Sequence, residues 1–425
     1  MPAACFLTSI LVALPEPRPN LNYVEWDEHG IADAGFGRQA RLYQDLLTPE
    51  ENDAFTRAVS GFKADTKKLD SIDAMPAYEI YLRERGKDND DLPGAAAMLR
   101  ALEERMRPIL RGAYNCASCS MCGVLLRRYR ASERLKVPNH FDRMAVVTAV
   151  ASLNPSEFAG GLYLQRTPRA ESREYFSSGN SSGRDVIFHS YDLNHGVHVH
   201  NGTRASIVFW YTDTDESCRD DVSPWYRAPA EAGSRDAQEA LAELHQLGQH
   251  GYERSAPAAA AWAEKAAEQG SATAAHRLGR MLLAGEGIPR DAARGLSLVR
   301  SAAEQGLADS QYTLGVACQY GDLEGGLEEA ARWFQLAADA GIAAAQYELG
   351  VAHVNGDGVE PDTLRGVRYL RLADAQGHRD ARSDLESMDK MSWERRGTSL
   401  DDDIRTLEAA EAARAAAQAP SKDEI

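Results

Sequence analysis

The sequence has little cysteine, no surplus of positive charge and no long apolar run. Six cysteines in 425 residues do not indicate a disulfide scaffold. A formal net charge of −17 disfavours nucleic acid as the main partner, because the protein as a whole repels phosphate backbones. No stretch is apolar for the roughly 20 residues that a transmembrane helix needs. The remaining class is a globular protein, whose length predicts two or three domains.

Short segments near the two ends bear on the compartment. Cys5 to Leu14 is as long as a signal-peptide core, but it lacks a basic region before it and a small-residue cleavage site. We therefore expect a buried strand there. Residues 422–425 read KDEI, one conservative change from the KDEL retention signal. The compartment stays open, with the cytoplasm slightly favoured and the endoplasmic reticulum lumen as the alternative.

Two local clusters have more than one interpretation. Cys116, Cys119 and Cys122 form a C-x-x-C-x-x-C run, but no second pair follows to complete a tetrahedral zinc site. We expect structural packing or a local redox role, with zinc as the alternative. A basic cluster is the one feature that favours nucleic acid, and it consists of Arg127, Arg128, Arg130, Arg134, Lys136 and Arg143.

The chain changes character near Ser217, where β-rich runs give way to alanine-rich helical patterns. Before that point, Thr48 and Glu51 form a capping box that predicts the start of a helix, and a second helix is expected over 94–110. Alternating apolar residues predict strands over 124–129, 145–153, 161–165, 185–189, 195–200 and 205–211. Many short strands without intervening helices indicate a β-sandwich or jelly roll.

The second part repeats itself. Gly270, Gly306, Gly341 and Gly377 each follow an alanine-rich helix, at spacings of 36, 35 and 36 residues. Such a period with two helices per unit is typical of an αα solenoid. The segments AAEQG, QYTLGVAC and QYELGVAHVNGDGV resemble Sel1-like repeats, which are related to tetratricopeptide repeats. The resemblance implies protein partners bound by the solenoid.

A possible metal site begins with His140 and Asp142, because an H-x-D triplet in an extended segment places an imidazole and a carboxylate on one side. Together they supply two thirds of the facial triad that holds iron(II). The third ligand must come from four downstream histidines, namely His189, His195, His198 and His200.

A predicted hairpin selects among these histidines. Asn201-Gly202 favours a two-residue turn, which would place Arg204 opposite Val199 and on the face of His195. His198 and His200 would then lie on the other face, and His189 is expected to be structural. Arg204 would sit roughly 13 Å from His195 along the strand. A five-carbon dicarboxylate could chelate iron and reach this guanidinium, which suits a carboxylate.

The residues His140-Phe141-Asp142, Gly160-Gly161-Leu162-Tyr163 and GRDVIFHSYDLNHGVHVHNGTRASIVFWY resemble the catalytic domain of prolyl 4-hydroxylases. The resemblance implies a double-stranded β-helix with Fe(II) bound by His140, Asp142 and His195. It also implies that Arg204, nine positions after His195, binds 2-oxoglutarate, with Tyr129 as the best match to a second cosubstrate contact. The segment from Tyr129 to His140 is longer and more basic than in the family and lacks its usual glycine.

The resemblance further implies a dioxygenase reaction, in which 2-oxoglutarate and O2 are consumed, succinate is released and a substrate is hydroxylated. Ascorbate is the expected reductant, and a prolyl residue of a protein or peptide is the expected target. A nucleic-acid or small-molecule oxygenase, or a repeat scaffold with an inactive oxygenase domain, remains as an alternative. Asp142 favours hydroxylation over halogenation, because halogenating relatives leave the carboxylate position empty.

The predicted fold class is therefore α+β and multidomain, with a jelly-roll oxygenase domain and an all-α Sel1/tetratricopeptide-like solenoid. The expected parts are an N-terminal extension (1–39), the oxygenase domain (40–213), a linker (214–255), the repeats (256–388) and a charged, alanine-rich tail (389–425).

Overall fold

The structure is a computed structural model that describes residues 22–25, 39–61, 79–89, 94–130, 135–165, 173–176, 183–191, 193–396 and 398–406. The predicted strand at Cys5 to Leu14 and the C-terminal KDEI lie outside these residues. The chain divides at Ala274 into two compact units, Met1–Ala274 and Ala275–Ile425. No helix in the described part of the chain is both long and apolar enough to span a membrane.

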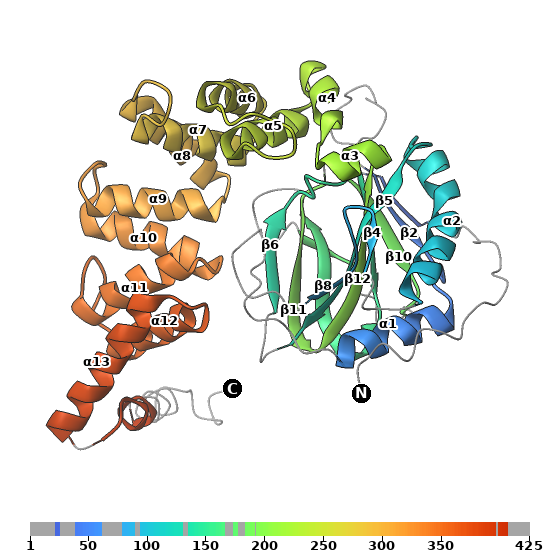
Figure 1. The fold of residues 1–425 in the computed structure, drawn as a ribbon. Helices are drawn as coiled ribbons and strands as arrows, with labels where there is room; N and C mark the ends of the chain where they lie inside the picture. Colours follow the sequence, from blue (N-terminus) through green and yellow to red (C-terminus); the bar gives the residue numbers. More distant parts are fainter. Residues whose placement is uncertain are drawn as a thin grey trace, which may run out of the picture. The chain divides into compact units, whose positions relative to one another are not determined.

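The first unit is built on two antiparallel sheets, as the strand pattern predicted (Figure 1). The large sheet has the order β1 (Asn22–Glu25), β2 (Gln39–Tyr43), β10 (Val186–Ser190), β7 (Val147–Ser152), β12 (Arg204–Thr212), β5 (Ser120–Tyr129), β3 (Glu79–Glu84) and β4 (Lys87–Asp88). The small sheet has the order β6 (Lys136–His140), β11 (His195–Gly202), β8 (Phe158–Gln165) and β9 (Arg173–Tyr175).

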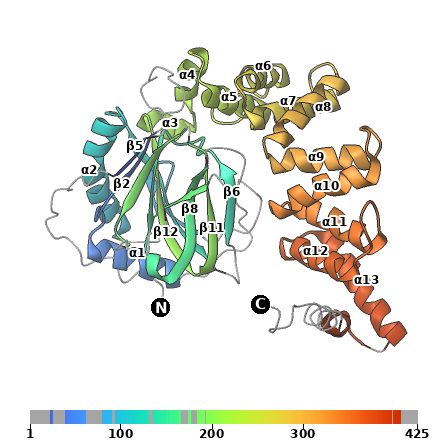
Figure 2. The same ribbon diagram turned by 180° about the vertical axis from the view of Figure 1, so that it is seen from behind.

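The two sheets pack face to face over a shared apolar layer. Val150 and Ile187 from the large sheet lie in one buried cluster with Leu162 and Val197 from the small sheet. Side chains alternate along a strand, so every second residue of these strands points into the layer. The view from behind shows the same two layers (Figure 2). Polar residues that point inward from either sheet also lie in this layer.

Two helices cover the other face of the large sheet (Figure 1). They are α1 (Pro49–Gly61) and α2 (Ala95–Ala113), and both were expected from the sequence. The Glu51 amide donates to Thr48 Oγ1 at 3.2 Å, and the Thr48 amide donates to Glu51 Oε2 at 2.8 Å, which is the predicted capping box. Phe188 of β10 packs with this helical layer, whereas its neighbour Ile187 faces the small sheet.

Four cysteines form two disulfides, which the sequence analysis did not predict. Cys116 pairs with Cys119, and Cys122 on β5 pairs with Cys218 on α3 (Asp215–Asp220). The second link joins residues 96 positions apart. All three cysteines of the C-x-x-C-x-x-C run are thereby used, which removes the zinc alternative. The fifth described cysteine, Cys318, is a buried free thiol.

The segment that follows the last strand of the sheets is helical. It contains α3, η4 (Pro224–Tyr226), α4 (Arg227–Glu231) and α5 (Arg235–Leu247), followed by α6 (Ala256–Glu268). Trp225, Leu241 and Leu244 belong to the same buried cluster as Phe188 and Phe209 of the large sheet. The stretch 214–255, which we expected to be a linker, therefore shares a core with the sheet unit.

The remaining helices pack as successive pairs. They are α7 (Ala272–Ala284), α8 (Ala292–Glu304), α9 (Ala308–Gln319), α10 (Gly326–Asp339), α11 (Ala343–Asn355), α12 (Thr363–Ala375) and α13 (Arg379–Arg396). The four periodic glycines at 270, 306, 341 and 377 all have positive φ. Each ends a helix in a conformation that glycine adopts at little cost, which explains why the period is marked by this residue. The predicted αα repeat architecture is confirmed.

Candidate metal centre

The end of β6 and the start of β11 bring two histidines together. His140 and His195 are register partners across this antiparallel pair, and their ring centroids are 4.4 Å apart. Both side chains point into the layer between the sheets, where His195 is 5% exposed. The local fold therefore places two imidazoles side by side, although 55 positions separate them in the sequence.

Asp142 completes a three-residue cluster. Its Oδ2 lies 3.3 Å from His195 Nε2, and its Oδ1 lies 3.6 Å from His140 Nε2. One ligand atom from each residue falls within 4.8 Å of the others. Two nitrogens and one oxygen at this separation match the donor set of a facial triad. Within the described residues, this is the one group of three or more histidine, cysteine or acidic side chains that could hold a metal ion.

Neighbouring groups orient these ligands. The Thr148 hydroxyl donates to Asp142 Oδ2 at 2.6 Å, and His195 Nδ1 lies 3.1 Å from the Leu193 carbonyl oxygen. A proton on Nδ1 makes the second contact a hydrogen bond and leaves the Nε2 lone pair directed at the cluster. Sequence reasoning missed Thr148, because nothing in its spacing from Asp142 marks it as a partner.

The electrostatics of the cluster favour a cation. Burial alone would raise the pKa of Asp142, but the adjacent imidazoles of His195 and His140 outweigh it and hold that pKa well below its ordinary value. The carboxylate therefore stays ionised inside the protein, and against the effect of burial it raises the pKa of His195 in turn. A dication bound by the three residues would take the place of the imidazole protons.

His189 lies next to the cluster without belonging to it. Its ring centroid is 4.3 Å from that of His195, and its Nδ1 lies 3.2 Å from the Ser190 carbonyl oxygen. Burial, and then the charge of His195, lowers the pKa of His189 to about 3, so this imidazole is neutral. His189 therefore presents a neutral ring with one nitrogen near a backbone carbonyl and a buried Nε2 without a hydrogen-bond partner, and its structural role stays a prediction.

The predicted hairpin between β11 and β12 is wrong. β11 pairs with β6 and β8 in the small sheet, whereas β12 pairs with β5 and β7 in the large sheet. The chain instead crosses between sheets near Gly202, which has a φ of 81°. His195 still faces inward, and His198 and His200 still face outward, because side chains alternate along a strand whatever its partner. The distance of roughly 13 Å from His195 to Arg204 was derived from that hairpin and is no longer supported.

Arg204 is nevertheless buried in the same interior, with Tyr129 as its register partner. Its Nε donates to Ser152 Oγ at 3.2 Å and its Nη1 to Ser206 Oγ at 3.1 Å. Its guanidinium carbon lies 5.3 Å from the centre of the Tyr129 ring. Ser206 could have been found from the sequence, because it lies two residues after Arg204 on the same strand face.

The remaining guanidinium nitrogen, Nη2 of Arg204, is buried and has no hydrogen-bond partner. Within the described residues, no carboxylate pairs with this side chain in the ion pairs of the protein. Burial lowers the pKa of the guanidinium, although the adjacent Tyr129 acts in the opposite direction. A buried guanidinium without a carboxylate partner lowers the stability of the folded protein, and a bound carboxylate would offset this loss.

The basic cluster expected to favour nucleic acid is largely engaged within the protein. Arg127 forms an ion pair with Glu79, and Arg143 forms one with Glu243. Arg128 is 6% exposed and donates to the Val59 carbonyl oxygen at 3.2 Å. Arg134 lies outside the described residues. Three of the six cations are therefore engaged within the protein, which weakens the argument for a nucleic-acid substrate.

Comparison with known families identifies the helical part. The Sel1 repeat model matches residues 235–271, 272–307, 308–342 and 343–378. The chain therefore carries Sel1 repeats, as the recurring glycines and the AAEQG-type segments predicted. The first repeat begins at residue 235, inside the stretch 214–255 that we had expected to be a linker.

Solved structures similar to the chain include both kinds of part. A Sel1 repeat protein from Oxalobacter formigenes is 32% identical, with a TM-score of 0.37, over 41% of this chain and 50% of that one. The chain thus matches about half the length of that structure. An oxidoreductase of the 2OG-Fe(II) oxygenase family from Burkholderia pseudomallei is 16% identical, with a TM-score of 0.33, over 44% of this chain and 94% of that one.

A further similar structure is the non-heme α-ketoglutarate-dependent epimerase of nogalamycin biosynthesis, which is 14% identical with a TM-score of 0.30. That match covers 41% of this chain and 77% of the epimerase. No curated protein matches the chain.

Proposed function

We propose that the first unit is an Fe(II)- and 2-oxoglutarate-dependent dioxygenase that hydroxylates a protein or peptide. The observation that carries the proposal is the convergence of His140, Asp142 and His195 on one buried point. In this reading, His140 and His195 supply nitrogen ligands and Asp142 supplies the oxygen ligand. A metal held by these three residues would keep coordination positions for the cosubstrate and O2.

Iron, when bound, would supply the activation of O2 that is coupled to decarboxylation of 2-oxoglutarate. The protein's part is to hold and orient. Thr148 fixes the carboxylate of Asp142, and the Leu193 carbonyl fixes the tautomer of His195. The apolar layer around Val150 and Val197 keeps bulk water from the interior.

Arg204 is the proposed anchor for the far carboxylate of 2-oxoglutarate. Its unpaired Nη2 is the donor that such a carboxylate would accept from, and the two serines hold the guanidinium in place. Tyr129, whose ring lies against this guanidinium, is proposed as a second contact to the cosubstrate.

For the substrate class, we propose a prolyl residue in a protein or peptide, with ascorbate as the reductant that maintains Fe(II). The Sel1 repeats support a macromolecular substrate, because solenoids of this kind present extended binding surfaces. The engaged arginines leave little support for nucleic acid. The intact ligand set and Arg204 favour an active enzyme over a repeat scaffold with an inactive oxygenase domain.

We also propose that the chain works in an oxidising compartment. Four cysteines are paired in disulfides, and such links persist where glutathione and thioredoxin do not reduce them. Of the two compartments that the sequence left open, this favours the endoplasmic reticulum lumen. Labelling of free thiols before cell lysis should mark at most Cys5 and Cys318.

The test of the proposed activity is succinate formation by the full chain. We expect succinate that depends on Fe(II) and O2, is faster with a proline-rich peptide, and is accompanied by a mass gain of one oxygen atom on that peptide. Asp142→Ala should form none. Succinate release at equal rates by the wild type and Asp142→Ala would overturn the proposal.

A further inference from the structure

The residue after Asp142 connects the metal centre to the first Sel1 repeat. Arg143 forms an ion pair with Glu243 on α5, and both side chains are largely buried. The carbonyl oxygen of Arg143 accepts a hydrogen bond from Ser223 Oγ at 2.7 Å. Glu243 therefore holds the side chain of Arg143 and Ser223 holds its backbone, and both partners lie outside the sheets.

The loop that carries Asp142 is itself a tight turn. The Arg143 amide donates to the Phe141 carbonyl oxygen at 3.0 Å, and the Ala145 amide donates to the Asp142 carbonyl oxygen at 3.0 Å. A shift of Arg143 therefore moves the backbone of Asp142. The contacts of Arg143 with Glu243 and Ser223 therefore affect the position of the Asp142 carboxylate.

Ser223 is in turn held by the connection between α5 and α6. Its amide donates to the His250 carbonyl oxygen at 3.1 Å, and the Tyr252 hydroxyl donates to the Ser223 carbonyl oxygen at 3.0 Å. His250 and Tyr252 both lie within residues 235–271, which match a Sel1 repeat. The backbone contact to Arg143 thus rests on the same repeat as the ion pair.

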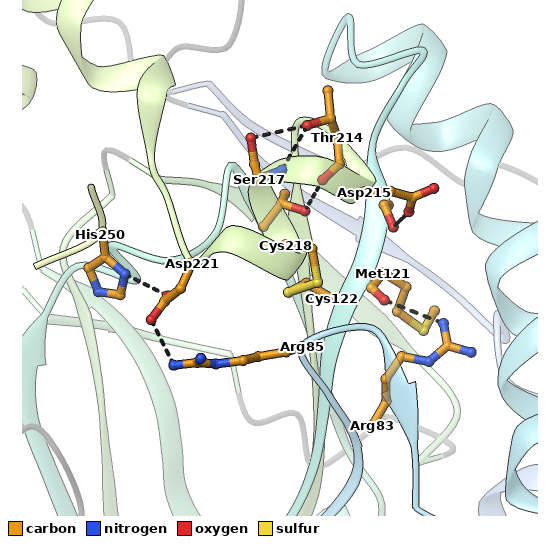
Figure 3. The surroundings of a disulfide bond; sticks show 12 residues. Arg83, Arg85, Met121, Cys122, Thr214, Asp215, Ser217, Cys218, Asp221 and His250 are labelled. Carbon is orange, nitrogen blue, oxygen red and sulfur yellow. Dashed lines mark hydrogen bonds and ion pairs between the residues drawn. A yellow bond between two sulfur atoms is a disulfide. The ribbon is translucent and has the colours of Figure 1, made fainter.

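The stretch just before Ser223, from Cys218 to Asp221, is also fixed to the large sheet (Figure 3). Cys218 is linked to Cys122 on β5. Three residues on, Asp221 contacts Arg85 at 2.9 Å through one carboxylate oxygen and His250 Nδ1 at 2.9 Å through the other. The segment is therefore anchored on both sides, so its contact with Arg143 has a defined position.

Apolar contacts also join the loop that carries Asp142, the segment after Ser223 and α5. Tyr226 is 1% exposed, and its ring packs edge to face on Tyr191 at 5.0 Å, just after β10. The Tyr191 amide donates to the Val146 carbonyl oxygen at 3.1 Å, at the far end of the loop that begins with Asp142. Both tyrosines share a buried cluster with Leu241 on α5. Val146, at the far end of the loop, belongs to this same buried cluster, so the end of the loop and α5 share one apolar core.

We propose that the first Sel1 repeat is a positioning element of the metal centre, acting on Asp142 through Glu243 and Arg143. The inference rests on the proposed function, because it takes Asp142 as a metal ligand. Glu243 offsets the positive charge of Arg143, which would otherwise repel a dication or compete for the Asp142 carboxylate. It also fixes the loop, so the ligand is presented in one place.

The test measures metal binding by the full chain without turnover, using Co(II) as the probe for its visible absorption. Glu243→Gln removes the charge and keeps the shape, and Ser223→Ala removes the backbone contact. Partners beyond the ligands typically change affinity by 10–100-fold, and these residues lie one contact further out, so we expect roughly 3–10-fold weaker binding and an altered absorption spectrum.

Further variants separate a positioning role from a general loss of structure. Glu268→Gln makes the same chemical change at an exposed site on α6 of the same repeat and should bind Co(II) like the wild type. Glu243→Asp keeps the charge and should retain most of the affinity. Arg143→Gln combined with Glu243→Gln should be no worse than Arg143→Gln alone, because both act through one contact.

The possible outcomes decide between the proposals. Wild-type affinity and spectrum in both Glu243→Gln and Ser223→Ala would overturn the positioning role, as would equal losses in Glu243→Gln and Glu268→Gln. If Glu243→Gln does not fold, Ser223→Ala and Glu243→Asp decide in its place. Failure of the wild type to bind Co(II), or unchanged binding in His140→Ala, would instead overturn the proposed function.

Discussion

His140 and His195 face each other across one antiparallel strand pair, with ring centroids 4.4 Å apart. β6 ends at the first residue and β11 begins at the second, so each imidazole is fixed by sheet hydrogen bonding. A site built on strand ends is positioned more accurately than one on free loops. Asp142 adds the third side chain from the turn that follows β6.

Replacing any one of these three residues should abolish metal binding. We expect His140→Ala, Asp142→Ala and His195→Ala to lose tight Fe(II) binding and 2-oxoglutarate turnover, because two ligands hold the ion far less well than three. Anaerobic equilibrium dialysis with Fe(II) measures the loss.

The matched controls are His198→Ala and His200→Ala, which remove imidazoles from the outward face of the same strand. Both should retain most of the binding and turnover. A larger loss of iron in His198→Ala than in His195→Ala would show that the metal is bound elsewhere.

Arg204→Ala should impair use of the cosubstrate and leave the metal site intact. We expect the KM for 2-oxoglutarate to rise by one to two orders of magnitude, which corresponds to roughly 1.5–3 kcal/mol for a hydrogen bond to a charged group. Fe(II) affinity without 2-oxoglutarate should barely change. An unchanged KM in the variant would exclude Arg204 as the anchor.

The hydrogen bond from Thr148 to Asp142 should contribute to metal affinity. Thr148→Val is close in shape but cannot donate, so we expect Fe(II) to bind about tenfold more weakly. Thr212→Val makes the same change at a buried threonine of β12, whose hydroxyl donates to the Thr214 carbonyl oxygen, and it should not affect metal binding. Equal affinities in the two variants would contradict the orienting role.

The two disulfides should differ in their contribution to stability. Cys122–Cys218 closes a loop with a sequence separation of 96 and should contribute about 2–4 kcal/mol to the free energy of unfolding, mainly by restricting the unfolded chain. Cys116–Cys119 closes a separation of 3 and should contribute much less. Urea unfolding of the two matched double alanine variants measures both. A larger loss from removing Cys116–Cys119 would contradict this account.

Much of the site could be predicted because it depends on local rules. The H-x-D spacing identified His140 and Asp142, and strand alternation separated His195 from His198 and His200, although the hairpin used to choose the inward face does not form. The spacing within H-x-D and the separation of the histidines into two faces need only the period of a strand, which holds whatever the partner strands are. The repeats were predicted for a similar reason, since each unit packs mainly on its neighbours.

The predictions that were wrong or missing concern contacts between residues far apart in the sequence. Asn201-Gly202 is a strong hairpin signal, but in a two-sheet fold the chain can cross between sheets at such a turn, and Arg204 pairs with Tyr129 instead. Nothing near Cys122 indicates that its partner is Cys218. The contacts of Arg143 with Glu243 could not be foreseen either, because they require the relative placement of the sheets and the first repeat.

The most direct test of the central claim is an anaerobic calorimetric titration of 2-oxoglutarate into the full chain loaded with Fe(II). We predict one binding site per chain for the wild type, binding about ten- to a hundredfold weaker in Arg204→Ala, and no binding in Asp142→Ala, which lacks a metal ligand. The absence of binding to the wild type, or equal binding by the wild type and Asp142→Ala, would contradict the account.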